Sequence, residues 1–401
     1  MSSVSIGSCT DILQIAVTED AYGGDAQFTG GVDGQQVGDT LTATSAHGSG
    51  QPDLVNVLGN WAAGPHTLTV SFLDDAWDGS PDTDRNLYVD GATFNGADES
   101  GAAAALYSNG SQSFSLADPG STINWNGNDS SPQPAVNAGD TLILRGGTYT
   151  AQGDQLSDVT VHLNGAQASP ATLAVQDGSI GKLQLQSFDN PASRSSYGNL
   201  DVAGTVSIGN PLQWGGRVAP DYPTVNLNDS ATLNLPGASL GRAASFVVNG
   251  APGSTVTNTG AMSLSATQRF AIHADLAGAG TIQSRPDSDS SGVMIELDGA
   301  VSAVQTVLLD AGTLQLDQPA RFMGMVAGVL PITDPAGGPS SQLVLEHATV
   351  TGTLFQQGTD NAGDLSIFTQ DQATGAAGTD VIHVAGSYAP DAFVFTNNTA
   401  T

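Results

Sequence analysis

The sequence is poor in cysteine, basic residues and long apolar runs, and each shortage excludes a class of protein. One cysteine, Cys9, in 401 residues allows no disulfide within the chain and no zinc site built from cysteines. Lys182 is the one lysine, and the 9 basic residues face 39 acidic ones. The formal charge of −30 excludes a basic surface for nucleic acid and disfavours anionic membranes. No segment approaches the roughly 20 apolar residues of a membrane-spanning helix.

Charged side chains are scarce overall, and only four of the 39 acidic residues are glutamates. Charged residues make up 12% of the chain, about half of the roughly 25% in an average soluble protein. Long amphipathic helices depend on Glu, Lys and Arg, so the composition disfavours a helical fold. Aspartate and the 50 glycines suit turns and sites for hard cations. We therefore expect an all-β protein.

The two ends of the chain bear on its location. The N-terminus, MSSVSIGSCTDILQIAV, lacks the cationic start and long apolar core of an ordinary secretory signal. Residues 378–401 are small, hydroxylated and apolar, without Lys or Arg, and resemble the C-terminal secretion signals of type I exported bacterial proteins. We expect an extracellular or cell-surface protein exported without an N-terminal signal peptide. A cytosolic protein with few thiols is the alternative.

Residues 11–116 contain short alternating strands separated by Gly, Asp and Asn turns about every ten residues. This pattern is typical of an antiparallel β-sandwich, here predicted as jelly-roll-like. Residues 117–139, rich in Pro, Gly, Ser and Asn, are predicted to be a linker. The expected strands are 12–17, 26–34, 40–46, 66–73, 86–96 and 112–116.

Residues 140–401 have a different pattern, in which short Val, Leu, Ile, Thr and Asn runs recur loosely every 20 to 25 residues. No helical period intervenes, so we predict a parallel β-solenoid of roughly ten coils. Its opening, GDTLILRGGTY, resembles the first coil of pectate-lyase-like right-handed β-helices. One or two further sandwich domains are the alternative.

Two loops of the first domain are crowded with carboxylates, within residues 18–28 and 73–90. So many carboxylates repel one another unless a divalent cation or water neutralises them. Calcium takes six to eight oxygen ligands, and neither loop holds the Cys or His that zinc or copper prefers. A solvated acidic turn is the alternative. The residues concerned are Glu19, Asp20, Asp25, Asp74, Asp75, Asp78, Asp82 and Asp84, with Asn86 and Arg85.

The run HTLTVSFLDDAWDG…DTDRNLYVDGATFNG resembles the calcium-dependent xylan-binding modules of carbohydrate-binding module family 60. The family motif has the form V-x-F-x-N-D-A…D-R-N-L-Y-V-D, and the upstream EDAYGGDAQF and VDGQQVG also fit. The resemblance covers residues 11–97. It implies a β-sandwich in which sugar hydroxyls complete the coordination of bound calcium. Asp74 stands where the family often has Asn, which leaves the number of ions open.

These observations lead to one predicted site. Trp77 and Tyr22 are its carbohydrate-binding candidates, because each ring adjoins an acidic loop and can hold the apolar face of a sugar. Core packing is the alternative for both rings. Arg85 is expected to pair with the aspartates as a structural residue. The predicted ligands of Ca²⁺ are Glu19, Asp20, Asp25, Asp74, Asp75, Asp84 and Asn86.

The second region offers little chemistry. Glu296 and Asp298 lie two apart on one strand face and could do glycosidase acid–base work, but chance pairs are expected among 39 acids. A lyase needs basic residues, which are scattered here. We therefore predict no catalytic residue and a secreted bacterial protein that binds polysaccharide through calcium, an adhesin or matrix protein on a solenoid scaffold. The alternatives are a polysaccharide lyase or hydrolase with a catalytic β-helix, and a self-assembling fibre or layer subunit.

Overall fold

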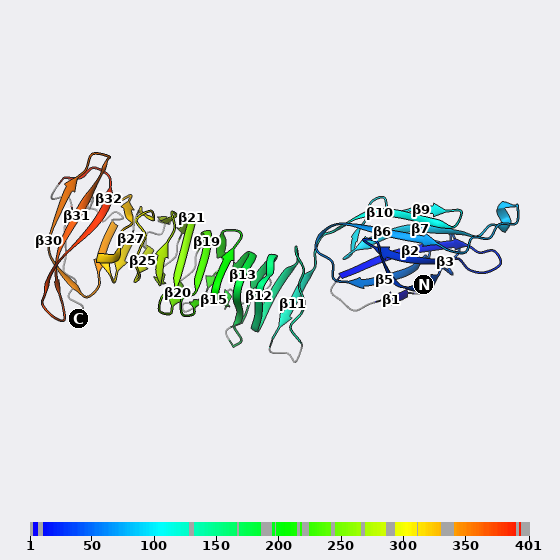
Figure 1. The fold of residues 1–401 in the computed structure, drawn as a ribbon, viewed down its shortest axis with the longest axis horizontal. Helices are drawn as coiled ribbons and strands as arrows, with labels where there is room; N and C mark the ends of the chain where they lie inside the picture. The colour runs from blue at the N-terminus through cyan, green and yellow to red at the C-terminus, as the bar shows by residue number, and fades with distance from the viewer. Residues whose placement is uncertain are drawn as a thin grey trace. The chain divides into compact units, whose positions relative to one another are not determined.

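The chain forms an antiparallel β-sandwich followed by a β-solenoid (Figure 1). The only helices among the described residues are two 3-10 turns, Pro81–Thr83 and Pro319–Arg321. The predicted all-β fold is confirmed. Cys9 lies outside the described residues, as does most of the predicted secretion tail beyond residue 389. The computed structural model describes residues 3–6, 11–127, 132–166, 168–185, 195–196, 198–214, 217–218, 224–241, 245–265, 269–285, 293–310, 312–329, 341–389 and 393.

The contacts divide the chain into two compact units. The first is Met1–Ile123 with Pro134–Thr141, and the second is Asn124–Gln133 with Leu142–Thr401. The predicted linker, 117–139, contains strand β11 (Thr122–Asn126), which heads the long sheet of the solenoid by pairing with the next strand. Within the described residues, no helix is long and apolar enough to cross a membrane.

The sandwich consists of two sheets. All neighbouring strands in them are antiparallel except β1 and β5, which pair in parallel. One sheet has the order β1 (Ser3–Ile6), β5 (Asp53–Gly59), β2 (Asp11–Asp20), β7 (Asn86–Phe94) and β8 (Ala97–Asp98), with β9 (Ala104–Leu106) also on β7. The other has the order β10 (Gly110–Asp118), β6 (Gly64–Phe72), β3 (Gln27–Val32) and β4 (Gln35–Thr42).

The sandwich core follows from the alternation of apolar residues along the strands. Leu13, Ile15 and Val17 of β2 are fully buried, because every second side chain of a strand points to the same face. Phe28 of β3 and Phe72 of β6 meet them from the opposite sheet. Each such side chain contributes about 1.5–3 kcal/mol by leaving water. This core holds the ends of β2, β3, β6 and β7, from which the acidic loops emerge.

The solenoid is built from one long sheet of twenty strands. Its strands after β11 are β12 (Thr141–Leu163), β13 (Ala171–Leu185), β15 (Gly198–Ile208), β16 (Leu212–Trp214), β18 (Thr224–Leu227), β19 (Thr232–Gly241), β20 (Ser245–Gly250), β21 (Thr255–Ser265), β22 (Arg269–His273), β23 (Asp275–Ala277), β24 (Thr281–Arg285), β25 (Val293–Leu297), β26 (Thr306–Leu309), β27 (Gly312–Leu316), β28 (Met325–Ala327) and β29 (Ser341–Leu345). The sheet ends with β30 (Ala348–Gln357), β31 (Ala362–Asp371) and β32 (Ala377–Ala385), and a separate pair is β14 (Ser195–Ser196) with β17 (Arg217–Val218).

Parallel strands of successive coils stack in register, so that buried apolar residues of one coil lie over those of the next. Phe246 lies over Phe270 with ring centroids 5.4 Å apart and buries an aromatic column in the core. The predicted count of roughly ten coils is wrong, because the solenoid has about six turns. Strands β30 to β32 form an antiparallel sheet instead of coils. The repeat also varies: 23 residues separate the paired Val225 and Val248 (248 − 225).

Close stacking of coils makes one glycine critical. Gly178 of β13 has φ +117°, and a Cβ there would lie 1.9 Å from the carbonyl oxygen of Gly153 on β12. An alanine at positive φ lowers the free energy of unfolding by itself. Gly178→Ala should lower it by about 1–3 kcal/mol beyond that amount, because the added Cβ also collides with the neighbouring coil. Gly153→Ala is the matched control, since its φ is +58° but no atom lies within 4 Å of its Cβ. Equal losses for both variants in urea unfolding would show that the coils are not closely stacked here.

Candidate functional site

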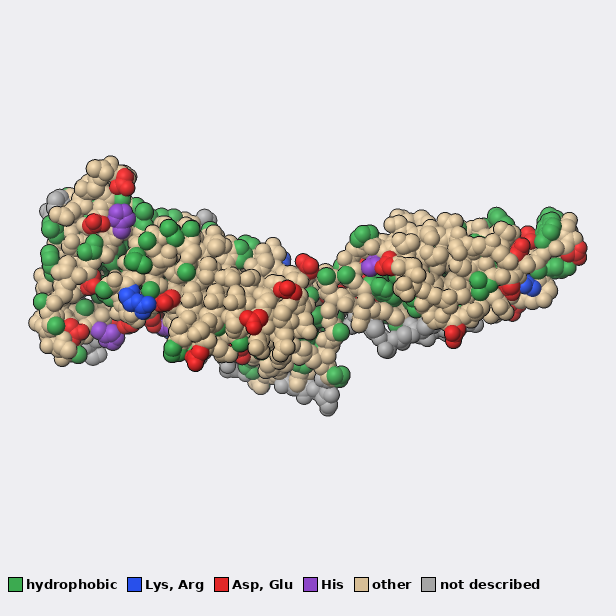
Figure 2. Space-filling view, in the orientation of Figure 1, with side chains coloured by type: hydrophobic (Ala, Val, Ile, Leu, Met, Phe, Trp, Pro, Cys, Tyr) green, Lys and Arg blue, Asp and Glu red, His purple; other side chains and the backbone are tan. Residues whose placement is uncertain are grey.

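The two acidic loops leave the sandwich at the same end. Residues 21–26 connect β2 to β3, and residues 73–85 connect β6 to β7. Strand β2 pairs with β7, and β3 pairs with β6, so the register brings the two loops together. Figure 2 shows acidic side chains gathered at one end of this unit. The structure thus places the two loops that were picked from sequence side by side.

The second loop folds back on itself as a small hairpin. Trp77 pairs with Asp84, and the amide of Arg85 donates to the carbonyl of Ala76 at 2.9 Å. Extended by two residues, this antiparallel register sets Asp75 opposite Asn86. On the other side, Asn86 pairs directly with Asp20 of β2. We call the four residues brought together in this way the oxygen cluster: Asp20, Asp75, Asp84 and Asn86.

The oxygen cluster has more oxygens than hydrogen-bond donors. The Asn86 amide donates to Asp84 Oδ2 at 3.1 Å, and the Tyr88 hydroxyl donates to Asp20 Oδ2 at 2.6 Å. Asp75 Oδ1 and Asn86 Oδ1 are buried and accept no hydrogen bond from any described residue. A buried oxygen without a donor costs about 1–3 kcal/mol. An oxygen-ligated hard cation satisfies such atoms, so the donor types fit calcium. Asp20, Asp75 and Asp84 do not form one of the groups of described residues whose ligand atoms all lie within 4.8 Å of one another, so the three carboxylates are not drawn together as tightly as a closed metal site requires.

Arg85 joins the two loops on the opposite side of the hairpin. Its guanidinium is buried and donates to the carbonyls of Tyr22 at 2.5 Å and Gly24 at 3.0 Å. It also donates to the carbonyl oxygen and Oδ2 of Asp74 at 2.6 and 2.9 Å. Asp74 Oδ1 accepts the amide of Gln27 at 2.7 Å. Arg85 therefore forms the structural ion pair expected for it. Both oxygens of Asp74 have protein donors, so calcium binding by Asp74 stays a prediction.

Glu19 lies on the core side of β2. Successive strand residues point to opposite faces, and the next residue, Asp20, belongs to the oxygen cluster on the other face. Only 3% of Glu19 is exposed, and its carboxylate accepts the amide of Ala26 at 2.5 Å. Burial, with a smaller contribution from the charge of nearby Asp25, raises the pKa of Glu19 to about 7 against the opposing hydrogen bond from the Ala26 amide. Asp25 is exposed. The seven predicted ligands thus fall into two groups, the oxygen cluster and the set Glu19, Asp25 and Asp74.

The predicted sugar-contacting rings occupy different environments. Trp77 is 55% exposed on the first arm of the hairpin, while Tyr22 is partly buried. The Tyr22 hydroxyl donates to Asp78 Oδ2 at 3.0 Å, which ties the first loop to the second. Trp77 is therefore free to contact a ligand, and its role in sugar binding stays a prediction.

Three residues near the oxygen cluster were not predicted from the sequence. His47 stacks on Tyr88 with ring centroids 3.7 Å apart, and Tyr107, 64% exposed, packs edge-on against Tyr88 at 6.1 Å. Asn109 accepts the amide of Asp75 at 2.7 Å. His47 and Tyr107 belong to segments distant from both acidic loops in sequence. The sequence feature that came nearest to indicating them was Tyr88, which lies within the DRNLYVD run and contacts both rings.

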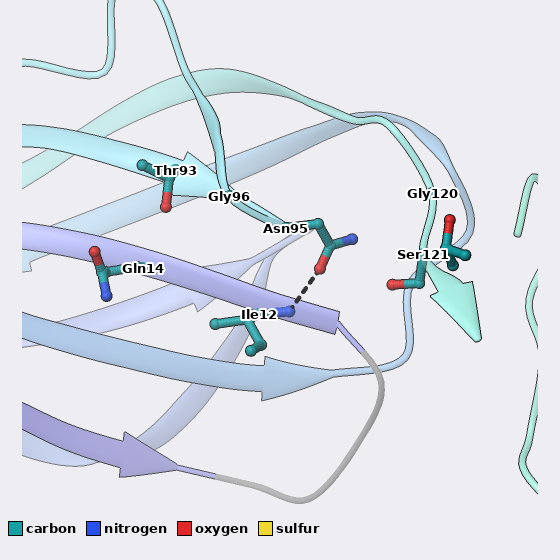
Figure 3. Close-up of a pocket in the computed structure, with 8 residues that line it drawn as sticks. Ile12, Gln14, Thr93, Asn95, Gly96, Gly120 and Ser121 are labelled. Atoms are coloured by element: carbon teal, nitrogen blue, oxygen red, sulfur yellow. Dashed lines mark hydrogen bonds between the residues drawn. The ribbon is translucent and has the colours of Figure 1, made fainter. Parts of the chain in front are cut away.

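A pocket lies toward the opposite end of β2 (Figure 3). Its lining is uncharged and mixes polar with apolar groups, and Asn95 Oδ1 accepts the amide of Ile12 at 2.9 Å between two of the lining residues. None of the predicted site residues lines it. The lining residues are Ile12, Gln14, Thr93, Asn95, Gly96, Gly120, Ser121 and Thr122.

Comparison with known proteins bears on the first unit. A family model of carbohydrate-binding module family 60, described as a Ca-dependent, xylan-binding carbohydrate-binding module, matches residues 12–109. No curated protein and no solved structure matches the chain. The matched residues include both acidic loops and the strands that carry them. The match indicates carbohydrate binding by the sandwich, which this chain carries on a β-solenoid scaffold.

Proposed function

We propose that the sandwich binds a polysaccharide such as xylan through calcium held by the oxygen cluster. The observation that carries this proposal is the pair of buried oxygens, Asp75 Oδ1 and Asn86 Oδ1, which accept no hydrogen bond from the described residues. They lie in an all-oxygen donor set within the residues matched by a Ca-dependent family. Asp20 and Asp84 supply the negative charge that a divalent cation requires.

The surroundings of the cluster suit a sugar. Bound calcium offers coordination positions that two neighbouring hydroxyls of a sugar can occupy. Trp77, exposed beside Asp84, presents a flat apolar face to the ring carbons of the same sugar. Arg85 holds both loops through their backbone carbonyls, which limits how far the loops must move to close around an ion.

For the whole chain we propose a secreted or surface bacterial protein, an adhesin or matrix component whose solenoid acts as scaffold. The low content of basic residues and the resemblance of residues 378–401 to type I secretion signals support export. The opening of the solenoid sequence, similar to pectate-lyase-like β-helices, supports a right-handed coil. A carbohydrate-binding module is also consistent with a location outside the cell.

Titration of the full chain with xylan oligosaccharides, in calcium and after chelation, tests the proposal. Binding should require calcium. Trp77→Ala should weaken sugar binding about tenfold or more and leave calcium binding unchanged, because the ring contacts only the sugar. Asp84→Ala and Asp20→Ala should weaken both. Asp90→Ala is the matched control, an exposed aspartate on the same strand as Asn86 that should change neither. Sugar binding that persists undiminished after chelation would refute the calcium-mediated mode.

A further inference from the structure

The last coils carry a row of acidic and histidine side chains on the outside of the solenoid. Ile272, Leu297, Leu316 and Leu345 pair in register across β22, β25, β27 and β29 and point into the core. The residue that follows each of these core residues therefore points outward, and the four outward residues lie in one row across the strands. These residues are His273, Asp298, Asp317 and Glu346, and the backbone hydrogen bonds continue through them. Neighbouring members of this outer row are separated by the strand spacing, about 4.8 Å.

One group in this region has the chemistry of a metal site. His273, Glu296 and Asp298 each place a ligand atom within 4.8 Å of the other two. His273 Nδ1 is hydrogen-bonded to Asp298 Oδ2 and lies 4.0 Å from Glu296 Oε1. Glu296 is 8% exposed, whereas the side chains of His273 and Asp298 are each 28% exposed, so solvent reaches the group. Figure 2 shows histidine and acidic side chains close together over the C-terminal coils.

The charges around this group are unbalanced. Arg269 donates to Glu296 Oε2 with Nε at 2.8 Å and Nη2 at 2.7 Å, and so leaves Oε1 turned toward His273. Asp298 Oδ1 is buried and accepts no hydrogen bond from any described residue. Asp317 and Glu346 follow on the next rungs. The Arg269 guanidinium thus pairs with one carboxylate of this region, Glu296, and one buried oxygen of Asp298 lacks a donor.

We propose that His273, Glu296 and Asp298 bind a divalent transition-metal ion of the zinc class. One imidazole nitrogen and two carboxylate oxygens are a donor set that zinc accepts, whereas calcium takes oxygen alone. Three protein ligands leave one position of a tetrahedral ion for water or another ligand. Arg269 orients Glu296 through the oxygen that the metal does not use, as an outer hydrogen-bond partner does in known metal sites.

A second group, Asp317, Glu346 and His347, lies farther along the same row with ligand atoms also within 4.8 Å of one another. The side chain of His347 is 79% exposed, and its Nε2 lies 3.2 Å from Asp317 Oδ1. An exposed imidazole must lose more rotamer freedom and more hydration to bind a metal. The tightest ion is therefore assigned to His273 and not to His347.

Zinc titration of the metal-stripped full chain tests the assignment. Millimolar calcium is kept in the cell throughout to saturate the sandwich, so this test does not depend on the proposed glycan-binding function. The wild type should bind zinc with calcium present, and His273→Ala and Glu296→Gln should each weaken the tightest site about tenfold or more. Cobalt in place of zinc should give the wild type a visible absorption that both variants lose.

Two controls make the result decisive. His383→Ala removes another partly exposed histidine, which pairs with Asp364 at 2.9 Å. Among the residues that the structure describes, His383 belongs to no group of three ligands, so this variant should leave zinc binding unchanged. His347→Ala should keep the tightest ion. Glu296→Gln retains the shape of the side chain, so it decides the matter if His273→Ala fails to fold. Zinc binding equal in Glu296→Gln and the wild type, or no zinc binding by the wild type, would reduce the group to a network of ion pairs.

Discussion

Replacement of Arg85 by alanine should lower the free energy of unfolding of the sandwich by about 3 kcal/mol. The variant leaves three loop carbonyls, those of Tyr22, Gly24 and Asp74, without their charged donor, and it leaves the Asp74 carboxylate without its counter-charge. Because these contacts hold the two acidic loops together, the oxygen cluster should lose its shape as well. Scanning calorimetry of the full chain, with and without calcium, identifies the sandwich transition as the one that chelation shifts.

A matched control separates burial from charge in this prediction. Arg321 also pairs with an aspartate, Asp275, at 3.2 Å, but the two side chains are 49% and 43% exposed. Arg321→Ala should therefore cost less than about 1 kcal/mol. If Arg85→Ala melts like the wild type and still binds calcium, the guanidinium does not organise the loops.

The calcium-free sandwich should lose stability as the pH rises from about 4.5 to 7, because of Glu19. Burial raises its pKa from 4.5 to about 7 in the folded chain. Between these values the folded state binds the proton and the unfolded state does not, so the free energy of unfolding falls with rising pH. A difference of this size corresponds to about 3 kcal/mol between pH values below 4.5 and above 7. Melting temperatures of chelator-treated, dialysed protein across this range measure the slope.

Glu19→Gln should remove this slope, since glutamine does not titrate and can still accept the amide of Ala26. A wild-type slope equal to that of the variant would contradict the buried, protonated Glu19. Repeating the series with calcium then tests the predicted role of Glu19 as a ligand. A cation bound to Glu19 favours its ionised form and should abolish the slope, whereas a carboxylate outside the ligand set should keep it.

Local properties of the sequence determined the fold class and the position of the acidic loops. Alternation of apolar residues, as at Leu13, Ile15 and Val17, is enough to predict strands with one buried face. The lack of helix-forming charged residues excluded helices for the same local reason. The exposed position of Trp77 also followed from its neighbours, which are small or acidic.

Tertiary structure decided how the predicted site residues are distributed. Glu19 and Asp20 are adjacent in sequence, yet the pleat of β2 sends one to the core side and the other to the oxygen cluster. Asp74 and Asp75 are likewise adjacent, yet Arg85 takes Asp74 while Asp75 lies opposite Asn86. The composition gives the number of carboxylates, but the register of the paired strands decides which of them lie on the same face.

The solenoid shows the same division. Strand runs with a loose repeat predicted stacked coils, but their number depended on where parallel pairing stops and the antiparallel strands β30 to β32 begin. Glu296 and Asp298 were recognisable as a pair on one strand face. His273, 25 residues before Asp298, joins them only because parallel strands of successive coils stack in register at the strand spacing. Such contacts join residues that are one coil apart in the sequence. They depend on how the coils stack and not on the neighbouring residues in the sequence.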